Sequence, residues 1–236
     1  MEGLFDIHCH FLWDVDDGAR SLEESMGLLL LEYSAGVRNI ILTPHYRVHM
    51  FETSEHIIRE RYEILRQTAA KDFPDLRLYL GCEFHANMEM ENQLLSRDQL
   101  FLPEKSSHIL LEFSSREGKN FCRERVQKAL SLGYIPVIAH CERYLFGDPS
   151  FFAELKRMGA ELQVNADSII GKDGFSVRQL CKKMIKMDLV DYIGSDGHDL
   201  SERRPHIGEC YRFLRKKYGE DYAQRIFIEN PSRLVR

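Results

Sequence analysis

The chain has 236 residues, of which 44% are hydrophobic, and this is enough to build one substantial core. Its formal net charge is -5, from 32 basic and 37 acidic residues. The sequence therefore lacks the overall positive charge of general nucleic-acid-binding proteins, and we expect one domain over residues 1–236 with no nucleic-acid partner.

The N-terminal sequence and the apolar stretches predict a cytoplasmic protein. Met1 leads directly into GLFDIHCH, a strand-like sequence, without a charged-then-apolar signal peptide. The longest apolar stretch, residues 27–31, is far too short to cross a bilayer, so no membrane insertion is expected. The 6 cysteines show no CxxC spacing, and free, buried thiols are their expected state.

Short apolar strands alternate along the chain with longer segments of helical pattern. Strands are predicted at residues 4–9, 39–43, 77–82, 108–113, 135–139, 161–165 and 191–194. Helices are predicted at residues 21–34, 53–70, 120–132, 149–158, 176–186, 205–218 and 221–226. The first helix opens on a capping box of Ser21 and Glu24, and residues 88–99 are ambiguous. This alternation predicts a parallel sheet, either closed into a barrel or open and doubly wound.

Potential metal ligands stand at the C-terminal ends of six of these seven strands, or in the loops directly behind them. They are His8, His10, Asp17, His45, Glu83, Glu112, His140, Asp196 and His198. Because the C-terminal ends of parallel strands meet at one face, where the active sites of α/β barrels lie, we expect these side chains to converge. His8 and His10 share one face of their strand, so they can bind one ion together.

Each of these residues alone carries little weight, because an HxH pair or a strand carboxylate is common without metals. Four carboxylates beside five histidines are different, since a buried carboxylate is costly unless it is paired or metal-bound. The set offers nitrogen and oxygen but no thiolate, which suits manganese, iron or zinc. The sequence therefore predicts a cluster of divalent ions, and surface or structural roles for the other histidines.

The motifs around these residues resemble the PHP (polymerase and histidinol phosphatase) superfamily. More narrowly, they resemble its bacterial branch of manganese-dependent protein-tyrosine phosphatases encoded with capsule and exopolysaccharide genes. The matching segments are DIHCHFLWDVDDG, TPHY, GCEF, LLEF, AHCERY and SDGHDLSERRP, in family order over residues 6–205. The resemblance implies an α/β fold, a distorted seven-stranded (β/α) TIM-like barrel of the PHP type.

The same resemblance implies three divalent metal ions, with Mn²⁺ expected and Fe or Zn as alternatives. The implied ligand groups are His8, His10, Glu83 and Asp196 for the first ion, Glu83, Glu112 and His140 for the second, and Asp17, His45 and His198 for the third. Arg143 and Arg203 correspond to the family's phosphate-binding arginines, and the neighbouring Arg204 stays open as an alternative to Arg203.

The implied activity is hydrolysis of a phosphomonoester, with a hydroxide that bridges two ions as the nucleophile. The implied substrate is phosphotyrosine of a bacterial tyrosine autokinase that regulates capsular or exopolysaccharide synthesis. The rival thiolate chemistry needs C-x5-R, and no cysteine has arginine six positions later. The residues at those positions are Val15, Met88, Lys128, Gly147, Met187 and Lys216.

Two alternatives stay open from the sequence. One keeps the superfamily and changes the substrate to histidinol phosphate or another small phosphoester. The other is a non-catalytic metal-binding module, which lost ligands would favour, although all nine are present here. The aromatic residues near the strand ends either line an entrance to the site or pack against the strands. These are Trp13, Tyr46, Phe84 and Tyr144.

Overall fold

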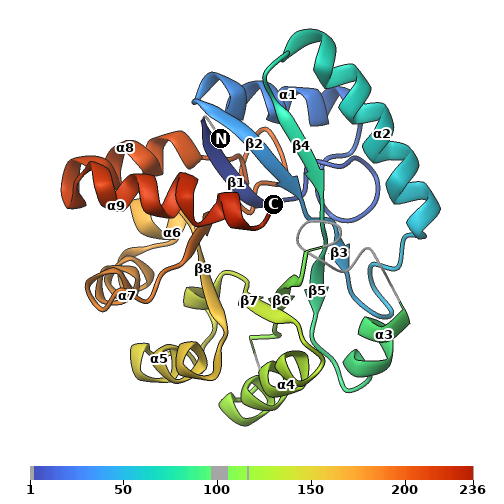
Figure 1. Ribbon diagram of the computed structural model, residues 1–236. Coiled ribbons are helices and arrows are strands. Elements are labelled where there is room, and N and C mark those ends of the chain that lie inside the picture. The colour runs from blue at the N-terminus through green and yellow to red at the C-terminus, as the bar shows by residue number, and fades with distance from the viewer. Residues whose placement is uncertain (1–2, 97–105, 116, 236) are drawn as a thin grey trace.

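The protein is described by a computed structural model that covers residues 3–96, 106–115 and 117–235 (Figure 1). Its strand segments are β1 (Leu4–Cys9), β2 (Val37–Leu42), β3 (His45–Tyr46), β4 (Arg77–Leu80), β5 (Glu83–His85), β6 (His108–Glu112), β7 (Ile135–Ile138), β8 (Glu161–Asn165) and β9 (Tyr192–Gly194). They pair in parallel in two sheets of order β1-β2-β4 and β3-β5-β6-β7-β8-β9. The parallel sheet curves as a half-barrel, which agrees with the predicted α/β class.

The helices lie outside the strands (Figure 1). They are α1 (Leu22–Ser34), α2 (Glu55–Asp72), α3 (Met90–Ser96), α4 (Lys119–Ser131), α5 (Pro149–Met158), α6 (Ala166–Ile170), α7 (Phe175–Lys186), α8 (Ile207–Tyr218) and α9 (Glu220–Gln224). Helix α3 falls within the ambiguous stretch 88–99, whose last three residues lie outside the described part of the chain. Among the described residues, no helix is both long and apolar enough to cross a membrane.

Two predicted strands, 39–43 and 77–82, end at Leu42 and Leu80, and each is followed after a break by a further short strand that was not predicted. Between β2 and β3 stands Pro44, which has no N–H to donate to a ladder. The two neighbouring segments keep their parallel register across the break, because Gly81 N–H donates to the Leu42 carbonyl (2.8 Å) and Glu83 N–H donates to the Pro44 carbonyl (3.1 Å). His45 and Glu83 therefore begin short strands of their own and do not end uninterrupted ones.

A small apolar core lies on the inner side of the sheets, separate from the large core that contacts the helices. It is formed by Phe5, Ile7, Ile41, Leu110, Val137, Ala139, Tyr192 and Leu234. The last described residues lie near the middle of the strands, where Leu234 belongs to this inner core (Figure 1). Most of these residues precede the strand ends, so the inner core supports the polar C-terminal mouth from beneath.

The start of the chain and the segment after β9 meet at this mouth. Asp196 N–H donates to the His8 carbonyl (2.8 Å), and His10 N–H donates to the Gly197 carbonyl (2.9 Å). The approach is close at Gly194, where an added Cβ would lie 2.6 Å from the Cβ of His8. Glycine is therefore needed at the end of β9, because it lets the two chains carry their polar residues to the same place.

Candidate metal centre

All nine predicted ligands lie together at the C-terminal mouth of the strands. Their candidate donor atoms form three overlapping groups, each with atoms within 4.8 Å of one another: His10, Asp17, His45 and His198; His8, His10 and Asp196; and His45, Glu83 and Glu112. His140 joins the cluster through its Nε2, which is 2.9 Å from Oε1 of Glu83. The structure thus brings the nine residues together, and their role as ligands stays a prediction.

The Glu83 carboxylate lies at the centre of this cluster and is fully buried. Its Oε2 is 3.1 Å from Nε2 of His8, 3.2 Å from Nε2 of His10 and 3.0 Å from Nδ1 of His45. The Nε2 atoms of His8 and His10 are themselves only 3.3 Å apart. Nitrogen and carboxylate donors that crowd around one point in this way suit a shared cation.

Three histidines are oriented by hydrogen bonds of their Nδ1 atoms. Nδ1 of His8 is 3.1 Å from Oε1 of Gln163, and Nδ1 of His10 is 2.8 Å from Oδ2 of Asp16. Nδ1 of His198 is 2.8 Å from the Asp196 carbonyl. An acceptor at Nδ1 assigns the proton to that nitrogen, so each ring presents the Nε2 lone pair to the cluster.

Several buried polar atoms of the cluster form no hydrogen bond of normal geometry among the described residues, although some lie within 3.5 Å of an oppositely charged group. They are Glu83 Oε2, Glu112 Oε2, His45 Nδ1, His140 Nδ1 and His198 Nε2. Buried polar atoms nearly always form hydrogen bonds, so a group of donor atoms without such bonds at one place indicates a ligand-binding site. Divalent cations fit the observation, because they take carboxylate oxygens and imidazole nitrogens at once.

The charges of the cluster favour cations. Burial lowers the pKa of His140, but the neighbouring Glu83 carboxylate outweighs burial and raises this pKa to about 9. Burial and the nearby Glu83 raise the pKa of Glu112 to about 7. In both cases the buried carboxylates make a further positive charge favourable and a further negative charge unfavourable.

Two of the nine residues have left-handed backbone conformations. His140 has φ 29° and Asp196 has φ 52°. Such conformations are uncommon for residues with a side chain and gather at functional sites, where the surrounding structure enforces them. At Asp196 the constraint is the pairing of its backbone N–H with β1.

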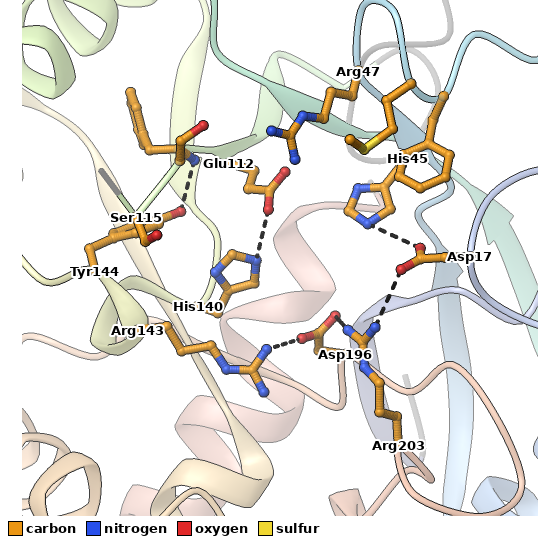
Figure 2. Close-up of a pocket in the computed structure, with 14 residues that line it drawn as sticks. Asp17, His45, Arg47, Glu112, Ser115, His140, Arg143, Tyr144, Asp196 and Arg203 are labelled. Carbon is orange, nitrogen blue, oxygen red and sulfur yellow. Dashed lines mark hydrogen bonds and ion pairs between the residues drawn. The ribbon is translucent and has the colours of Figure 1, made fainter. Parts of the chain in front are cut away.

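A cavity of about 620 Å³ opens beside the cluster and holds both predicted arginines. Nη1 of Arg143 donates to Oδ2 of Asp196 (2.6 Å), and Nη2 of Arg203 donates to Oδ1 of the same carboxylate (3.5 Å). Figure 2 shows the two guanidinium groups on either side of Asp196. Arg204 does not line this cavity, and its Nε contacts Nε2 of His206 (3.1 Å).

The cysteines of the chain are free and buried, as predicted. Burial raises the pKa of several thiols above the ordinary value, those of Cys9, Cys122, Cys141, Cys181 and Cys210. A buried thiol with a raised pKa is a poor source of thiolate. The structure therefore agrees with the sequence in offering no cysteine nucleophile among these residues.

Of the aromatic residues near the strand ends, Tyr144 lines the cavity. Its hydroxyl accepts a hydrogen bond from the Phe113 N–H (3.0 Å). Tyr46 and Phe84 instead stack on each other, with ring centroids 5.6 Å apart, and both are buried. Trp13 lies beneath the guanidinium of Arg61. Packing is thus the role of most of this set.

Sequence reasoning did not assign a role to Asp16, Gln163 or Arg47. Asp16 binds Nδ1 of His10 and accepts from the His45 N–H (2.9 Å), whereas the sequence pointed to its neighbour Asp17. Oε1 of Gln163 contacts His8 and accepts from the His140 N–H (2.7 Å). Arg47 lines the cavity. Adjacent acidic residues in the DDG motif were the one available signal for Asp16.

Nearly the whole chain matches a known family. Residues 4–236 fit the family described as "Capsular polysaccharide synthesis, CpsB/CapC". This chain belongs to the CpsB/CapC family. The predicted resemblance to capsule-associated phosphatases is thereby confirmed at the level of the family.

Curated relatives of this CpsB/CapC chain carry the name tyrosine-protein phosphatase. CpsB of Streptococcus pneumoniae is 34% identical over 239 residues, which cover 98% of each chain. CpsB of Streptococcus agalactiae is 32% identical over 99% of this chain and 98% of its own. YwqE of Bacillus subtilis is 29% identical, over 99% of this chain and 92% of its own.

Solved structures agree with this assignment. A chain from the study of YwqE of Bacillus subtilis and CpsB of Streptococcus pneumoniae, described as unique metal-dependent tyrosine phosphatases, matches with a TM-score of 0.90. It is 29% identical, and the match covers 99% of this chain and 94% of that one. The phosphotriesterase homology protein of Escherichia coli matches with a TM-score of 0.64 at 12% identity, over 100% of this chain and 99% of its own, which shows the similarity of fold alone.

Gln163 offers a test of the cluster that does not depend on activity. Gln163→Met keeps the size of the side chain but removes the acceptor that orients His8 and the loop at His140. We expect the affinity for Mn²⁺ to fall roughly 10- to 100-fold, as measured by competition with a fluorescent chelator. The exposed Gln127→Met is the matched control. Wild-type affinity in Gln163→Met would show that this contact does not support metal binding.

Proposed function

We propose that this CpsB/CapC chain is a metal-dependent protein-tyrosine phosphatase. Its proposed substrate is phosphotyrosine of a bacterial tyrosine autokinase that regulates capsular or exopolysaccharide synthesis. The observation that carries the proposal is the convergence of nine residues with nitrogen or oxygen donors beside a cavity that holds the two predicted arginines. The names of the family's relatives support the same activity.

The residues suit three divalent ions, for which Mn²⁺ is the first candidate and Fe or Zn the alternatives. We assign them to groups of His8, His10, Glu83 and Asp196; of Glu83, Glu112 and His140; and of Asp17, His45 and His198. The unpaired donor atoms of Glu83, Glu112 and His198 support this assignment. When bound, such ions supply Lewis acidity and lower the pKa of water that they hold.

The two arginines bind and orient the phosphate in this proposal. Their guanidinium groups match phosphate oxygens in a two-pronged geometry that lysine does not copy. Both already lie at the Asp196 carboxylate, so both reach one of the proposed metal ligands. Arg203 is preferred over Arg204, because the latter contacts His206 outside the cavity.

The shape of the cavity supports an aryl phosphate ester. Its wall combines the guanidinium groups of the arginines with the side chains of Met50, Phe51 and Tyr144. An aromatic ring can pack on such a wall while its phosphate reaches the arginines. The exposed Met50, which lines the cavity, adds apolar surface of the kind that protein partners contact.

We also propose the finer description of the fold, a distorted seven-stranded barrel of the PHP type formed by one domain over residues 1–236. Counting β2 with β3 and β4 with β5 as interrupted single strands gives seven, and the bridge between Cys9 and Gly197 supports closure. We propose the cytoplasm as its location, where an intracellular kinase domain would be its substrate.

A substrate panel tests the proposed activity. With Mn²⁺ present, we expect a phosphotyrosine peptide to be hydrolysed with a higher kcat/KM than a phosphoserine peptide or histidinol phosphate. A strong chelator should abolish the activity, and Mn²⁺ should restore it. Preference for histidinol phosphate would assign the chain to small phosphoesters, and no hydrolysis of any substrate would favour a non-catalytic metal-binding module.

Arginine variants test the proposed phosphate clamp, which is the pair Arg143 and Arg203, separately from metal binding. Arg143→Ala and Arg203→Ala should keep the fold and the metal content but lose stabilisation of the transition state. A loss of about 2–4 kcal/mol is typical for a preorganised donor, which lowers kcat/KM roughly 30- to 1000-fold. Arg204→Ala is the matched control and should be much milder. Near-wild-type kinetics in both cavity variants would remove the clamp from this proposal.

A further inference from the structure

Arg47 is held by its backbone while its guanidinium group extends into the cavity (Figure 2). It follows β3 directly, and its N–H and carbonyl both pair with Phe51 at 2.9 and 2.8 Å. Unlike Arg143 and Arg203, its guanidinium has no hydrogen bond or ion pair within the described part of the chain. The charge of Arg47 acts on the nearby carboxylates of Glu112 and Glu117, but neither forms a direct ion pair with it. A half-buried guanidinium without a directly bound anion at a cavity wall is suited to an oxygen acceptor from a ligand.

Arg47 also lines a second cavity, of about 470 Å³, next to the first. The second cavity is bounded by residues 47–49 and 85–89, together with Gln93, Glu117 and Phe121. Arg47 belongs to the lining of both cavities, whereas residues 85–89 line the second cavity and not the first. Arg47 therefore lies at the boundary between the two cavities.

The second cavity has a fixed wall. The buried guanidinium of Arg125 donates to the Asn87 carbonyl (3.2 Å), and the Asn87 amide donates to Oε1 of Gln93 (2.8 Å). Nε2 of His85 is 2.9 Å from Oγ of Ser114. A wall held by such contacts is formed before any ligand arrives, which reduces the entropy lost on binding.

The two cavities differ in the chemistry that they offer. Within the described residues, the candidate metal groups border only the first cavity. The second combines carboxylates at Glu89 and Glu117 with the apolar Met88 and Phe121. A phosphate is disfavoured beside those carboxylates, whereas an amino-acid side chain and its backbone suit this mixed lining.

Figure 2 shows Arg47 across the cavity from Arg143 and Arg203, on the side of Glu112. The phosphate-binding arginines are thus on one side of the cluster, and Arg47 is on the side that leads to the second cavity. If the phosphotyrosine of a peptide binds in the first cavity, the residue next to it in the peptide would lie against Arg47.

We propose that Arg47 and the second cavity bind the peptide segment next to the phosphotyrosine. Arg47 donates hydrogen bonds to an oxygen acceptor of that segment, either a main-chain carbonyl or a side-chain carboxylate. The second cavity holds the adjacent side chain. This inference rests on the proposed phosphatase activity and makes Arg47 a specificity residue, which favours peptides over isolated phosphotyrosine.

The test compares substrates with and without flanking residues. The substrates are N-acetyl phosphotyrosine amide, a phosphotyrosine peptide with alanine neighbours and one with acidic neighbours. Wild-type protein should have a higher kcat/KM for both peptides than for the amide. In Arg47→Met, the ratio of peptide to amide kcat/KM should fall roughly 10-fold or more, the size of a lost charge-assisted hydrogen bond. Most of the change should lie in KM.

The two peptides distinguish the acceptors. A larger loss for the acidic peptide identifies a carboxylate as the partner of Arg47, and equal losses for both peptides identify a main-chain carbonyl. Arg212→Met, an exposed arginine on α8, is the matched control and should keep the wild-type ratio. Metal content and melting temperature are measured for every variant, so that a disturbed cluster is recognised.

Binding of a non-hydrolysable phosphonate analogue of the alanine peptide gives a second readout by calorimetry, and Arg47→Met should weaken it by a similar factor. The inference is overturned if wild-type protein treats peptides and amide alike, or if Arg47→Met lowers kcat/KM equally for all three substrates. Hydrolysis of the amide in those cases would leave the proposed phosphatase activity intact. Absence of hydrolysis by wild-type protein would contradict both proposals.

Discussion

The fully buried Glu83 carboxylate lies within 3.2 Å of four imidazole rings, and the architecture of the site depends on this arrangement. The rings come from β1 and the residue directly after it, from β3 and from the turn after β7, so parallel strands must end at the same level for them to meet. Burying an isolated carboxylate costs free energy, and histidine lone pairs that face the carboxylate make the local electrostatic potential still more negative. The cluster at the mouth of the strands therefore needs positive charge to compensate it.

Polar residues around the cluster hold its members in place. Gln163 and Asn165 lie on one face of β8, and the Gln163 amide donates to Oδ1 of Asn165 (2.8 Å). Asn165 in turn donates to Oδ2 of Asp196 (2.9 Å). Beneath them, the hydroxyl and N–H of Ser195 donate to Asp6. These contacts link β1, β8 and β9, so that the orientation of the proposed ligands is part of the fold and not a property of mobile loops.

Most of the nine cluster residues could be predicted from the sequence because the periodicity of strands and the parallel sheet together fix where strand ends meet, whereas the choice of Asp17 over Asp16 came from the resemblance to the PHP superfamily. Gln163 could not, since a glutamine within Glu-Leu-Gln-Val-Asn looks like any polar strand residue. Its role depends on which strands become neighbours, and Oε1 reaches both His8 and the His140 N–H only after folding. Arg47 was missed for a related reason, because the two cavities that it separates are formed only in the folded chain.

Local signals also had limits within the secondary structure. The short strands β3 and β5 were not predicted, because Thr-Pro-His at 43–45 and Gly-Cys-Glu at 81–83 resemble the loops behind strands that end there. Ser21 accepts from the Glu24 N–H as the capping box requires, but the Glu24 carboxylate accepts from the Arg20 N–H (2.9 Å) and forms an ion pair with Arg20. Helix α6 was also missed, since five residues are too few for a helical period to be recognised.

The central claim is that the cluster around Glu83 exists to hold cations, and metal stoichiometry tests it most directly. Protein prepared without chelator and loaded with Mn²⁺ should contain about three transition-metal ions per chain by elemental analysis, as expected from the three groups of donors. In Glu83→Gln, in which the shared carboxylate is neutral, the content should fall by more than one ion. Fewer than one ion per chain in the wild-type protein after loading would contradict the account.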